Sequence, residues 1–325
     1  MSNLCKPRQL GATDIHVSPV ALGCWPIAGM TSIDVNDTDS LATLEAAVDA
    51  GVTFFDTAYG YGAKGESERL IAKALGHRRN ELAIATKCGM HWNDQLERTF
   101  DARPEIIKRQ CDESLQRLKT DRVELLYLHA PDPKVDVAES AGALKELMDA
   151  GKARSVGVSN FNVEQLATFH AVCPITAFQP PYNMLQRDIE QDTLPWCREH
   201  GVSVVVYWPL MKGLLAGKLS RDHIFPPNDG RAKYPMFQGQ EWQKNQDFID
   251  VLREISDSIG RSVAQLVINW TLQQSGITSA LCGAKRAYQI EETAGAMEFV
   301  LSPEQLQKID IAIQERGVVI TRPAV

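Results

Sequence analysis

The chain has 325 residues, of which 44% are hydrophobic, and a formal net charge of −7 at pH 7. That length suits two ordinary domains or one α/β barrel, and no run of Lys or Arg provides the charge that nucleic-acid binding requires. The seven cysteines are scattered without a Cys-x-x-Cys pair, which argues against a disulfide framework and a zinc site and favours a reducing compartment.

The N-terminal segment MSNLCKPRQLGATD contains no apolar signal region, and no apolar stretch approaches the roughly 18 residues of a membrane helix. No spacing typical of metal ligands is present either. We therefore expect a cytoplasmic protein that binds neither membrane nor nucleic acid and holds no metal.

Apolar, strand-like runs alternate with amphipathic, helix-like runs after a hairpin predicted over residues 8–20. The strands are predicted at 21–24, 53–57, 82–86, 125–129, 155–158, 177–179, 202–207 and 279–282. The helices are predicted at 40–50, 66–75, 104–118, 137–150, 163–171, 194–200 and 248–259. Eight such units without a linker predict one (β/α)8 TIM barrel domain over residues 1–325.

Two further segments complete the predicted architecture. Residues 213–245, after the seventh strand, are too polar and too long for a plain connection, and we expect a functional loop or lid. Residues 302–316 begin with Ser-Pro-Glu, which predicts an extra C-terminal helix.

The glycines Gly60, Gly62 and Gly65 match the spacing G-x-G-x-x-G of dinucleotide-binding folds. A dinucleotide fold needs its first glycine directly after the strand and an acidic residue at the end of the next strand. Here Asp56-Thr57-Ala58-Tyr59 lies between the apolar run and Gly60, and the next strand ends in Lys87. The doubly wound nucleotide domain is therefore rejected.

Three consecutive strands end in ionisable residues, namely Asp56, Lys87 and His129, and Tyr61 lies in the loop after the first of them. An ion-pair network at the barrel rim would account for the charges alone. If the groups act together, Lys87 lowers the pKa of the Tyr61 phenol, Asp56 keeps Lys87 charged, and His129 orients a carbonyl. Such a set can deliver a proton but contains no source of electrons, so a reduction would need a hydride from another molecule.

These residues resemble the aldo-keto reductases over nearly the whole chain. The resemblance rests on Asp56-Thr57-Ala58-x-x-Tyr61-Gly62, Ser67-Glu68, Thr86-Lys87, Leu128-His129 and Pro131-Asp132. It implies a catalytic tetrad with Tyr61 as general acid, Lys87 and Asp56 setting its pKa, and His129 orienting the carbonyl. It also implies NAD(P)H-dependent reduction of aldehydes or ketones to alcohols.

The same resemblance implies a nicotinamide cofactor stretched across the barrel mouth. The carboxamide is expected at Ser159, Asn160 and Gln179, the nicotinamide ring at Tyr207, the pyrophosphate at Pro209, Leu210, Gly213, Leu215 and Lys218, and the adenosine phosphate at Gly283, Lys285, Arg286, Gln289, Glu292 and Thr293. Lys285 and Arg286 favour NADPH over NADH, unless they are two solvated residues of a surface turn. Cys282 and Thr293 depart from the family pattern, where proline and asparagine are usual.

Aromatic side chains at Trp25, Tyr59 and Trp92 are expected to wall the substrate pocket, which suits a small carbonyl compound or a sugar. Three alternatives remain open: an NAD-dependent dehydrogenase of aldoses or secondary alcohols on the same fold, a nucleotide-sensing regulatory subunit with slow turnover, and a Schiff-base aldolase using Lys87. A monomer is the default expectation, and a homo-oligomer stays open.

Overall fold

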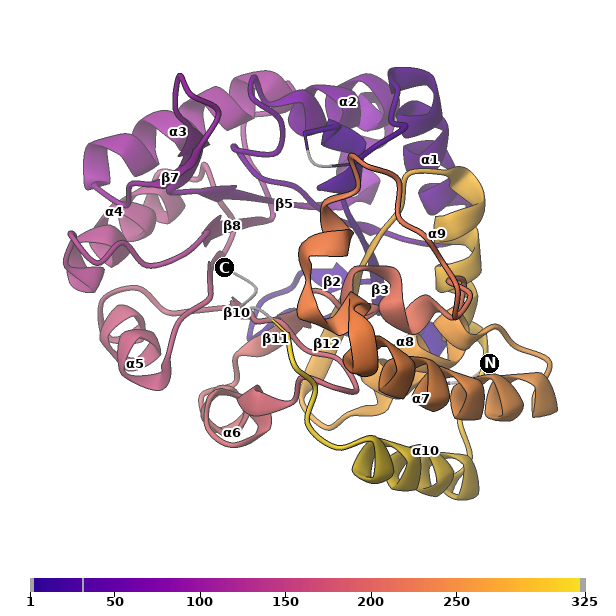
Figure 1. The fold of residues 1–325 in the computed structure, drawn as a ribbon. Coiled ribbons are helices and arrows are strands. Elements are labelled where there is room, and N and C mark those ends of the chain that lie inside the picture. Colours follow the sequence, from indigo (N-terminus) through magenta and orange to yellow (C-terminus); the bar gives the residue numbers. More distant parts are fainter. Residues whose placement is uncertain (1–2, 31, 322–325) are drawn as a thin grey trace.

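The computed structural model describes residues 3–30 and 32–321 and contains a closed barrel of parallel strands (Figure 1). Neighbouring strands follow the order β10-β11-β12-β3-β4-β5-β8-β9 around the barrel. Their bounds are β3 (Val20–Gly23), β4 (Phe54–Asp56), β5 (Ala83–Cys88), β8 (Leu125–Leu128), β9 (Val156–Ser159), β10 (Ala177–Gln179), β11 (Ser203–Val206) and β12 (Ile277–Gly283). The predicted eight-stranded barrel is confirmed.

The helices surround this barrel (Figure 1). Their bounds are α1 (Asp37–Asp49), α2 (Glu66–Leu75), α3 (Pro104–Leu118), α4 (Val137–Asp149), α5 (Val163–Val172), α6 (Thr193–Glu199), α7 (Gly239–Ser258), α8 (Val263–Gln273), α9 (Ala287–Ala294) and α10 (Pro303–Arg316). The predicted extra C-terminal helix is α10, which packs beside α7.

Alternation along each strand divides the apolar residues into two cores. Phe54 belongs to the cluster inside the barrel, whereas its neighbour Phe55 belongs to the cluster between barrel and helices. The same division separates Tyr127, which points inward, from Leu126, which packs under the helices. Alternate residues of a strand therefore point into the barrel and toward the helices, and the same alternation applies to the residues at the strand ends.

The predicted N-terminal hairpin consists of β1 (Arg8–Gln9) and β2 (His16–Val17), paired antiparallel. Leu10, Ile15 and Val17 are buried and belong to the cluster inside the barrel. The hairpin therefore closes the barrel at the end where the strands begin, which leaves the end where the strands finish for the chemistry.

The segment after β5 contains an antiparallel hairpin, β6 (Met90–Trp92) and β7 (Arg98–Phe100). The segment after β11 holds three 3-10 turns, η5 (Met211–Ala216), η6 (Gly230–Lys233) and η7 (Pro235–Phe237). It is shorter than predicted, because α7 begins at Gly239 and not at residue 248.

Two helices differ from the prediction for opposite reasons. The first turns of α7 bury polar side chains such as Asn245, which donates to the Met236 carbonyl at 2.8 Å, so an apolar period is missing there. Helix α8 is absent from the prediction. Most of its residues are buried, so no polar face marks its helical period.

The glycine-rich loop between β4 and α2 closes on its own side chains. Gly65 caps α2 with a φ of 73°, and a Cβ there would lie 2.6 Å from the Arg117 side chain. The Glu66 carboxylate accepts a hydrogen bond from the Lys64 N–H at 2.8 Å, occupying one of the loop amides that a phosphate would need. This arrangement agrees with the rejection of a dinucleotide loop.

Gly65→Ala should lower the free energy of unfolding by about 1–2 kcal/mol, because a left-handed backbone is costly for any residue with a Cβ. Gly142→Ala is the matched control, since Gly142 lies inside α4 and a Cβ there would meet no atom within 4 Å. We expect the control to gain about 0.5–1 kcal/mol. Urea unfolding measures both, and a loss at Gly142 or a gain at Gly65 would contradict this account of the loop.

Candidate active site

Strand alternation brings three ionisable side chains to the inside of one barrel rim. Asp56 ends β4, Lys87 is the penultimate residue of β5, and His129 follows β8 directly. The residues two positions earlier all belong to the cluster inside the barrel: Phe54, Ala85 and Tyr127. Because successive side chains alternate, the three ionisable groups continue these inward-facing rows into the mouth.

Lys87 is the centre of this group. Its ammonium forms an ion pair with Asp56, and both side chains are 1% exposed. The same nitrogen donates to the Thr57 carbonyl at 2.8 Å and to the Tyr61 hydroxyl at 3.2 Å. All three donors of the ammonium therefore have acceptors. The second Asp56 oxygen accepts from the Gln179 amide at 2.7 Å.

The direction of the pKa shift of Tyr61 differs from the prediction. Burial, followed by the Asp56 carboxylate, raises the pKa of the Tyr61 hydroxyl well above its ordinary value. The predicted depression by Lys87 is wrong for this site, because the Lys87 ammonium is paired with Asp56 and the phenol is desolvated. Tyr61 is therefore a neutral phenol at neutral pH, which is the form that can donate a proton.

His129 is held neutral beside this phenol. Burial, with added repulsion from Lys87 and Arg98, lowers the pKa of His129 well below its ordinary value. Its ring centroid lies 5.8 Å from that of Tyr61, and its Nδ1 has no hydrogen-bond partner among the described residues. A neutral imidazole next to a protonated phenol can donate a hydrogen bond to the oxygen that receives the proton.

Two of the three predicted aromatic walls stand at this mouth. The Trp25 ring meets the Tyr61 ring edge-on at 4.9 Å between centroids, and Trp92 lies 6.3 Å from Trp25. The Trp92 indole N–H donates to the Gly60 carbonyl at 2.8 Å, which ties the β6–β7 hairpin to the loop that carries Tyr61.

Tyr59 is not part of this wall. Its hydroxyl donates to Glu113 of α3 at 2.7 Å, and the Arg117 guanidinium lies 4.2 Å from its ring centroid. The expectation that Tyr59 covers the mouth is wrong, because α3 offers its ring a cation and its hydroxyl a carboxylate.

Four residues predicted around a nicotinamide form one hydrogen-bonded cluster. The Asn160 amide donates to the His129 carbonyl at 3.1 Å and to the Ser159 hydroxyl at 3.0 Å, and it accepts from the Tyr207 hydroxyl at 2.7 Å. Ser159 in turn donates to the Gln179 carbonyl at 2.7 Å. The ends of β9, β10 and β11 are thus linked to the tetrad, through His129 and through the bond from Gln179 to Asp56.

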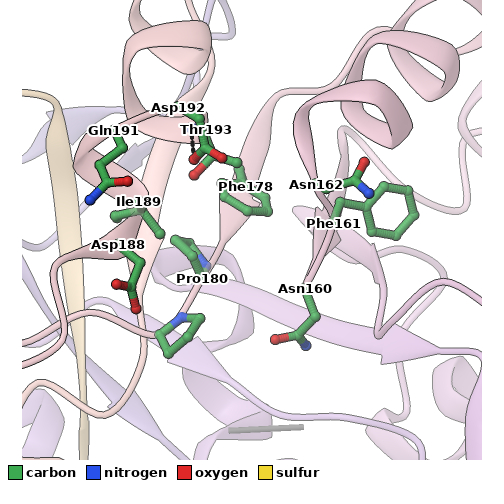
Figure 2. A pocket seen from close by; sticks show the side chains of 11 residues that line it. Asn160, Phe161, Asn162, Phe178, Pro180, Asp188, Ile189, Gln191, Asp192 and Thr193 are labelled. Atoms are coloured by element: carbon green, nitrogen blue, oxygen red, sulfur yellow. Dashed lines mark hydrogen bonds between the residues drawn. The ribbon is translucent and has the colours of Figure 1, made fainter. Parts of the chain in front are cut away.

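A cavity of about 390 Å³ lies beside this cluster (Figure 2). Asn160, Phe161, Pro180, Asp188 and Thr193 are among its lining residues, and none of the four tetrad residues lines it. It therefore shares Asn160 with the candidate site but not the chemistry.

The predicted adenosine-phosphate residues gather at the start of α9. The Gln289 side chain accepts from the backbone N–H groups of Lys285 and Arg286, at 2.8 and 3.2 Å. The Lys285 ammonium donates to the Ile33 carbonyl at 3.0 Å, and the Arg286 guanidinium donates to the Asp34 carbonyl at 2.8 Å. Both basic side chains therefore point toward the loop between β3 and α1. The other predicted residues here are Gly283, at the end of β12, and Thr293, whose hydroxyl donates to the Gln289 carbonyl at 3.1 Å.

The predicted pyrophosphate segment lies against the same helix. Lys218 forms an ion pair with Glu292 of α9 at 2.8 Å. Within η5, Lys212 and Gly213 have φ values of 57° and 88°. Leu215 is fully buried. The remaining residues of the prediction, Pro209 and Leu210, lead into η5.

Two basic residues near the mouth, Lys212 and Arg98, are absent from the predicted site. The Lys212 ammonium lies 4.3 Å from the Trp208 ring centroid and 4.8 Å from that of Tyr234. Arg98 lies on β7, opposite Trp92. Met90 and Trp92 are large apolar residues two positions apart, and Arg98 and Phe100 repeat that spacing on the second strand. This alternation is the sequence signal that could have predicted the hairpin and, with it, the position of Arg98.

In the part of the chain that the structure describes, neither a metal-binding cluster nor a membrane-spanning helix is found. Residues 3–30 and 32–321 contain no group of three or more His, Cys, Asp and Glu side chains arranged to hold a metal ion. Within the same ranges, no helix combines the length and the apolar composition needed to cross a membrane.

Comparison with known proteins agrees with this geometry. Residues 19–314 match the profile of the aldo/keto reductase family. Aldo-keto reductase YhdN of Bacillus subtilis (strain 168) is 36% identical over 310 residues, 94% of this chain and 93% of its own. The structure of the glycerol dehydrogenase AKR11B4 from Gluconobacter oxydans superposes with a TM-score of 0.91 at 33% identity, covering 100% of this chain and 99% of its own.

A second solved structure, the holo form of aldo-keto reductase AKR11C1 from Bacillus halodurans, gives a TM-score of 0.77 at 28% identity over 95% of this chain and 96% of its own. The match over most of the chain and the identity to a curated relative establish the family. The chain belongs to the aldo/keto reductases, a family of NAD(P)-dependent oxidoreductases.

Proposed function

We propose that this protein uses NADPH to reduce small aldehydes or ketones to alcohols, with Tyr61 as the general acid. The observation that carries the proposal is the buried ammonium of Lys87, which binds the Asp56 carboxylate and the Tyr61 hydroxyl together. A pair of buried charges is costly to maintain, and here it positions a neutral phenol at the barrel mouth.

The residues of the mouth suit a carbonyl group that becomes an alcohol. When bound, the nicotinamide cofactor supplies the hydride that reduces the carbonyl carbon. Tyr61 holds the proton that the carbonyl oxygen receives, and the neutral His129 ring orients that oxygen by hydrogen bonding. Trp25 and Trp92 limit the entry of water and provide apolar walls.

The donor set fits a nicotinamide dinucleotide. Ser159, Asn160 and Gln179 offer the hydroxyl and amide groups that satisfy a neutral carboxamide, and the Tyr207 ring offers a platform. Bonds of Asn160 to Ser159 and Tyr207 hold three of these side chains together and support the proposal. The Gln179 bond to Asp56 would connect a bound carboxamide directly to the tetrad.

The basic residues expected at the adenosine end of the cofactor favour NADPH, which carries an additional 2′-phosphate. In a chain of net charge −7, Lys285 and Arg286 lie at the start of α9, where the helix dipole favours anions. Arg286 also lies 3.4 Å from the Asp39 carboxylate, and Lys218 pairs with Glu292 farther along the same helix. Each basic side chain keeps donors beyond the bonds described above, because a guanidinium has five N–H groups and an ammonium three. A 2′-phosphate there would distinguish NADPH from NADH.

A second candidate is oxidation of small alcohols on the same scaffold. It is favoured by the likeness to the protein named as a glycerol dehydrogenase, with a TM-score of 0.91. The two directions use the same residues with the proton moving the opposite way. Initial rates with a panel of aldehydes and NADPH, and with a panel of alcohols and NADP, compare the two directions, and absence of turnover in both panels would overturn the proposal.

Tyr61→Phe should reduce kcat for carbonyl reduction by roughly 10²- to 10⁴-fold, because only the proton donor is removed. The Kd for NADPH, measured by fluorescence titration, should change little. Tyr59→Phe is the matched control, since the Tyr59 hydroxyl is bound to Glu113 outside the mouth. Near-normal kcat in Tyr61→Phe, or an equal loss in both variants, would contradict the assignment.

The pH profile of reduction should be flat between about pH 6.5 and about pH 10. A raised pKa keeps Tyr61 protonated up to the alkaline end, and a lowered pKa keeps His129 neutral down to the acidic end. Steady-state kcat at saturating NADPH tests this plateau. An alkaline decline centred well below pH 10 would contradict this plateau.

Arg286→Gln should lower kcat/KM for NADPH about tenfold or more and leave the value for NADH little changed. A hydrogen bond to a charged group contributes about 1.5–3 kcal/mol, and each 1.4 kcal/mol is about a factor of ten. Arg78→Gln is the control, because Arg78 pairs with Glu81 on the surface after α2. Equal losses with both cofactors would remove the basis for NADPH preference.

A further inference from the structure

The hairpin above the barrel mouth presents one face to the candidate site. In the antiparallel pair of β6 and β7, Trp92 lies directly opposite Arg98, and Met90 lies opposite Phe100. Residues that are directly opposite, and those two apart on one strand, share a face of the pair. Met90, Trp92, Arg98 and Phe100 therefore lie on the same face of the hairpin.

That face looks toward the loop that carries Tyr61. Trp92 donates to the Gly60 carbonyl at 2.8 Å and packs beside Trp25. Met90 is close to the same glycine, since a Cβ on Gly60 would lie 2.6 Å from the Met90 sulfur. The position of Trp92 thus directs its cross-strand neighbour Arg98 toward the mouth.

The effect of the Arg98 charge on other groups agrees with this direction. Its charge acts to lower the pKa of Tyr61, of His129 and of Tyr207, although burial dominates in each. These groups follow three different strands, β4, β8 and β11, around the barrel. Only a cation placed over the opening is close to all of them.

Arg98 is also exposed and lacks an anionic partner. Among the residues that the structure describes, no carboxylate lies within ion-pair distance of its guanidinium, whose closest ring contact is Phe100 at 5.8 Å. The nearest acidic residues in the chain are engaged elsewhere: Glu97 accepts from Asn93 at 3.1 Å, and Asp101 pairs with Arg103 at 2.7 Å. Its hydrogen-bond donors are thus available to a ligand.

We infer that Arg98 binds an anionic group of the substrate, and that preferred substrates are aldehydes or ketones that carry a carboxylate or a phosphate. The inference rests on the proposed function and narrows its substrate class. A guanidinium recognises both anions with paired N–H donors. The carbonyl would lie at Tyr61 and His129, the apolar part of the substrate against Trp25 and Trp92, and the anion at Arg98.

The cofactor does not account for this cation. The basic residues expected at its phosphates, Lys218, Lys285 and Arg286, lie by α9 and contact Glu292 or the loop after β3. Arg98 belongs to the hairpin after β5, next to the tetrad. Lys212, the other basic residue near the mouth, is packed over the rings of Trp208 and Tyr234.

Matched substrate pairs test the inference with the full-length protein and NADPH. One pair is 4-carboxybenzaldehyde and its neutral methyl ester, and the other is glyceraldehyde 3-phosphate and glyceraldehyde. We expect kcat/KM at least tenfold higher for the anionic member of one pair or both, and the pair that responds identifies the anion. Arg98→Gln should lower that selectivity at least tenfold, whereas Arg98→Lys should retain part of it, more for phosphate than for carboxylate.

Arg103→Gln is the matched control, because Arg103 lies in the same segment but pairs with Asp101. It should leave the selectivity of the wild-type protein intact. Equal kcat/KM within both wild-type pairs, or a selectivity that Arg98→Gln does not reduce, would overturn the inference.

Equilibrium binding separates this inference from the proposed function. Binding of benzoate and of benzamide, followed by tryptophan fluorescence of the NADPH complex, requires no turnover. We expect benzoate to bind at least tenfold more tightly, with an affinity that falls as salt rises and is lost in Arg98→Gln. If this holds while no carbonyl is reduced, the proposed function fails and Arg98 stands as an anion site. Equal binding of both probes would overturn the inference even in an active reductase.

Discussion

The site depends on the burial of one ion pair. Lys87 and Asp56 are each 1% exposed, and leaving either charge without the other in such a place costs several kcal/mol. The pair exists because β4 and β5 are neighbours in a closed barrel and both side chains face inward. Closure of the barrel excludes water from both side chains. Without water, each charge is stabilised mainly by the other. The position of Tyr61 follows, since the remaining donor of Lys87 holds its hydroxyl.

The same burial decides the protonation states around that pair. Desolvation favours the neutral phenol of Tyr61 and the neutral imidazole of His129. Tyr61 therefore keeps its proton, and the neutral His129 ring beside it can donate a hydrogen bond. Neither group carries a net charge. The guanidinium of Arg98, on the hairpin at the rim, has no ion-pair partner among the described residues and faces the mouth. The basic residues near α9 lie apart from Arg98. In the proposed function, the barrel would carry the chemistry and the segments above it the selectivity.

Local alternation in the sequence was sufficient to predict the barrel and the core of the site. Each strand is a short apolar run, and in β4, β5 and β8 the next residue of the inward row is ionisable, namely Asp56, Lys87 and His129. The period of two depends only on backbone geometry, so inward direction can be read without knowing the neighbours. The eight repeats then require closure, which places these ends on one rim. The amide and aromatic ends Gln179 and Tyr207 obey the same rule.

Tertiary structure decided what alternation does not control. Tyr59 lies in a loop, where the partner offered by α3 sets the direction of the side chain. The start of α7 was hidden because its buried face contains Asn245, whose partner Met236 is a tertiary contact. The pKa of Tyr61 moved opposite to the expectation, since desolvation depends on everything packed around the group. Arg98 gained its place only through pairing of two short strands. The sequence by itself determined the order and direction of the strand ends, because these are local, and only the folded chain determined loop side chains and proton affinities, because these depend on residues far apart in the chain.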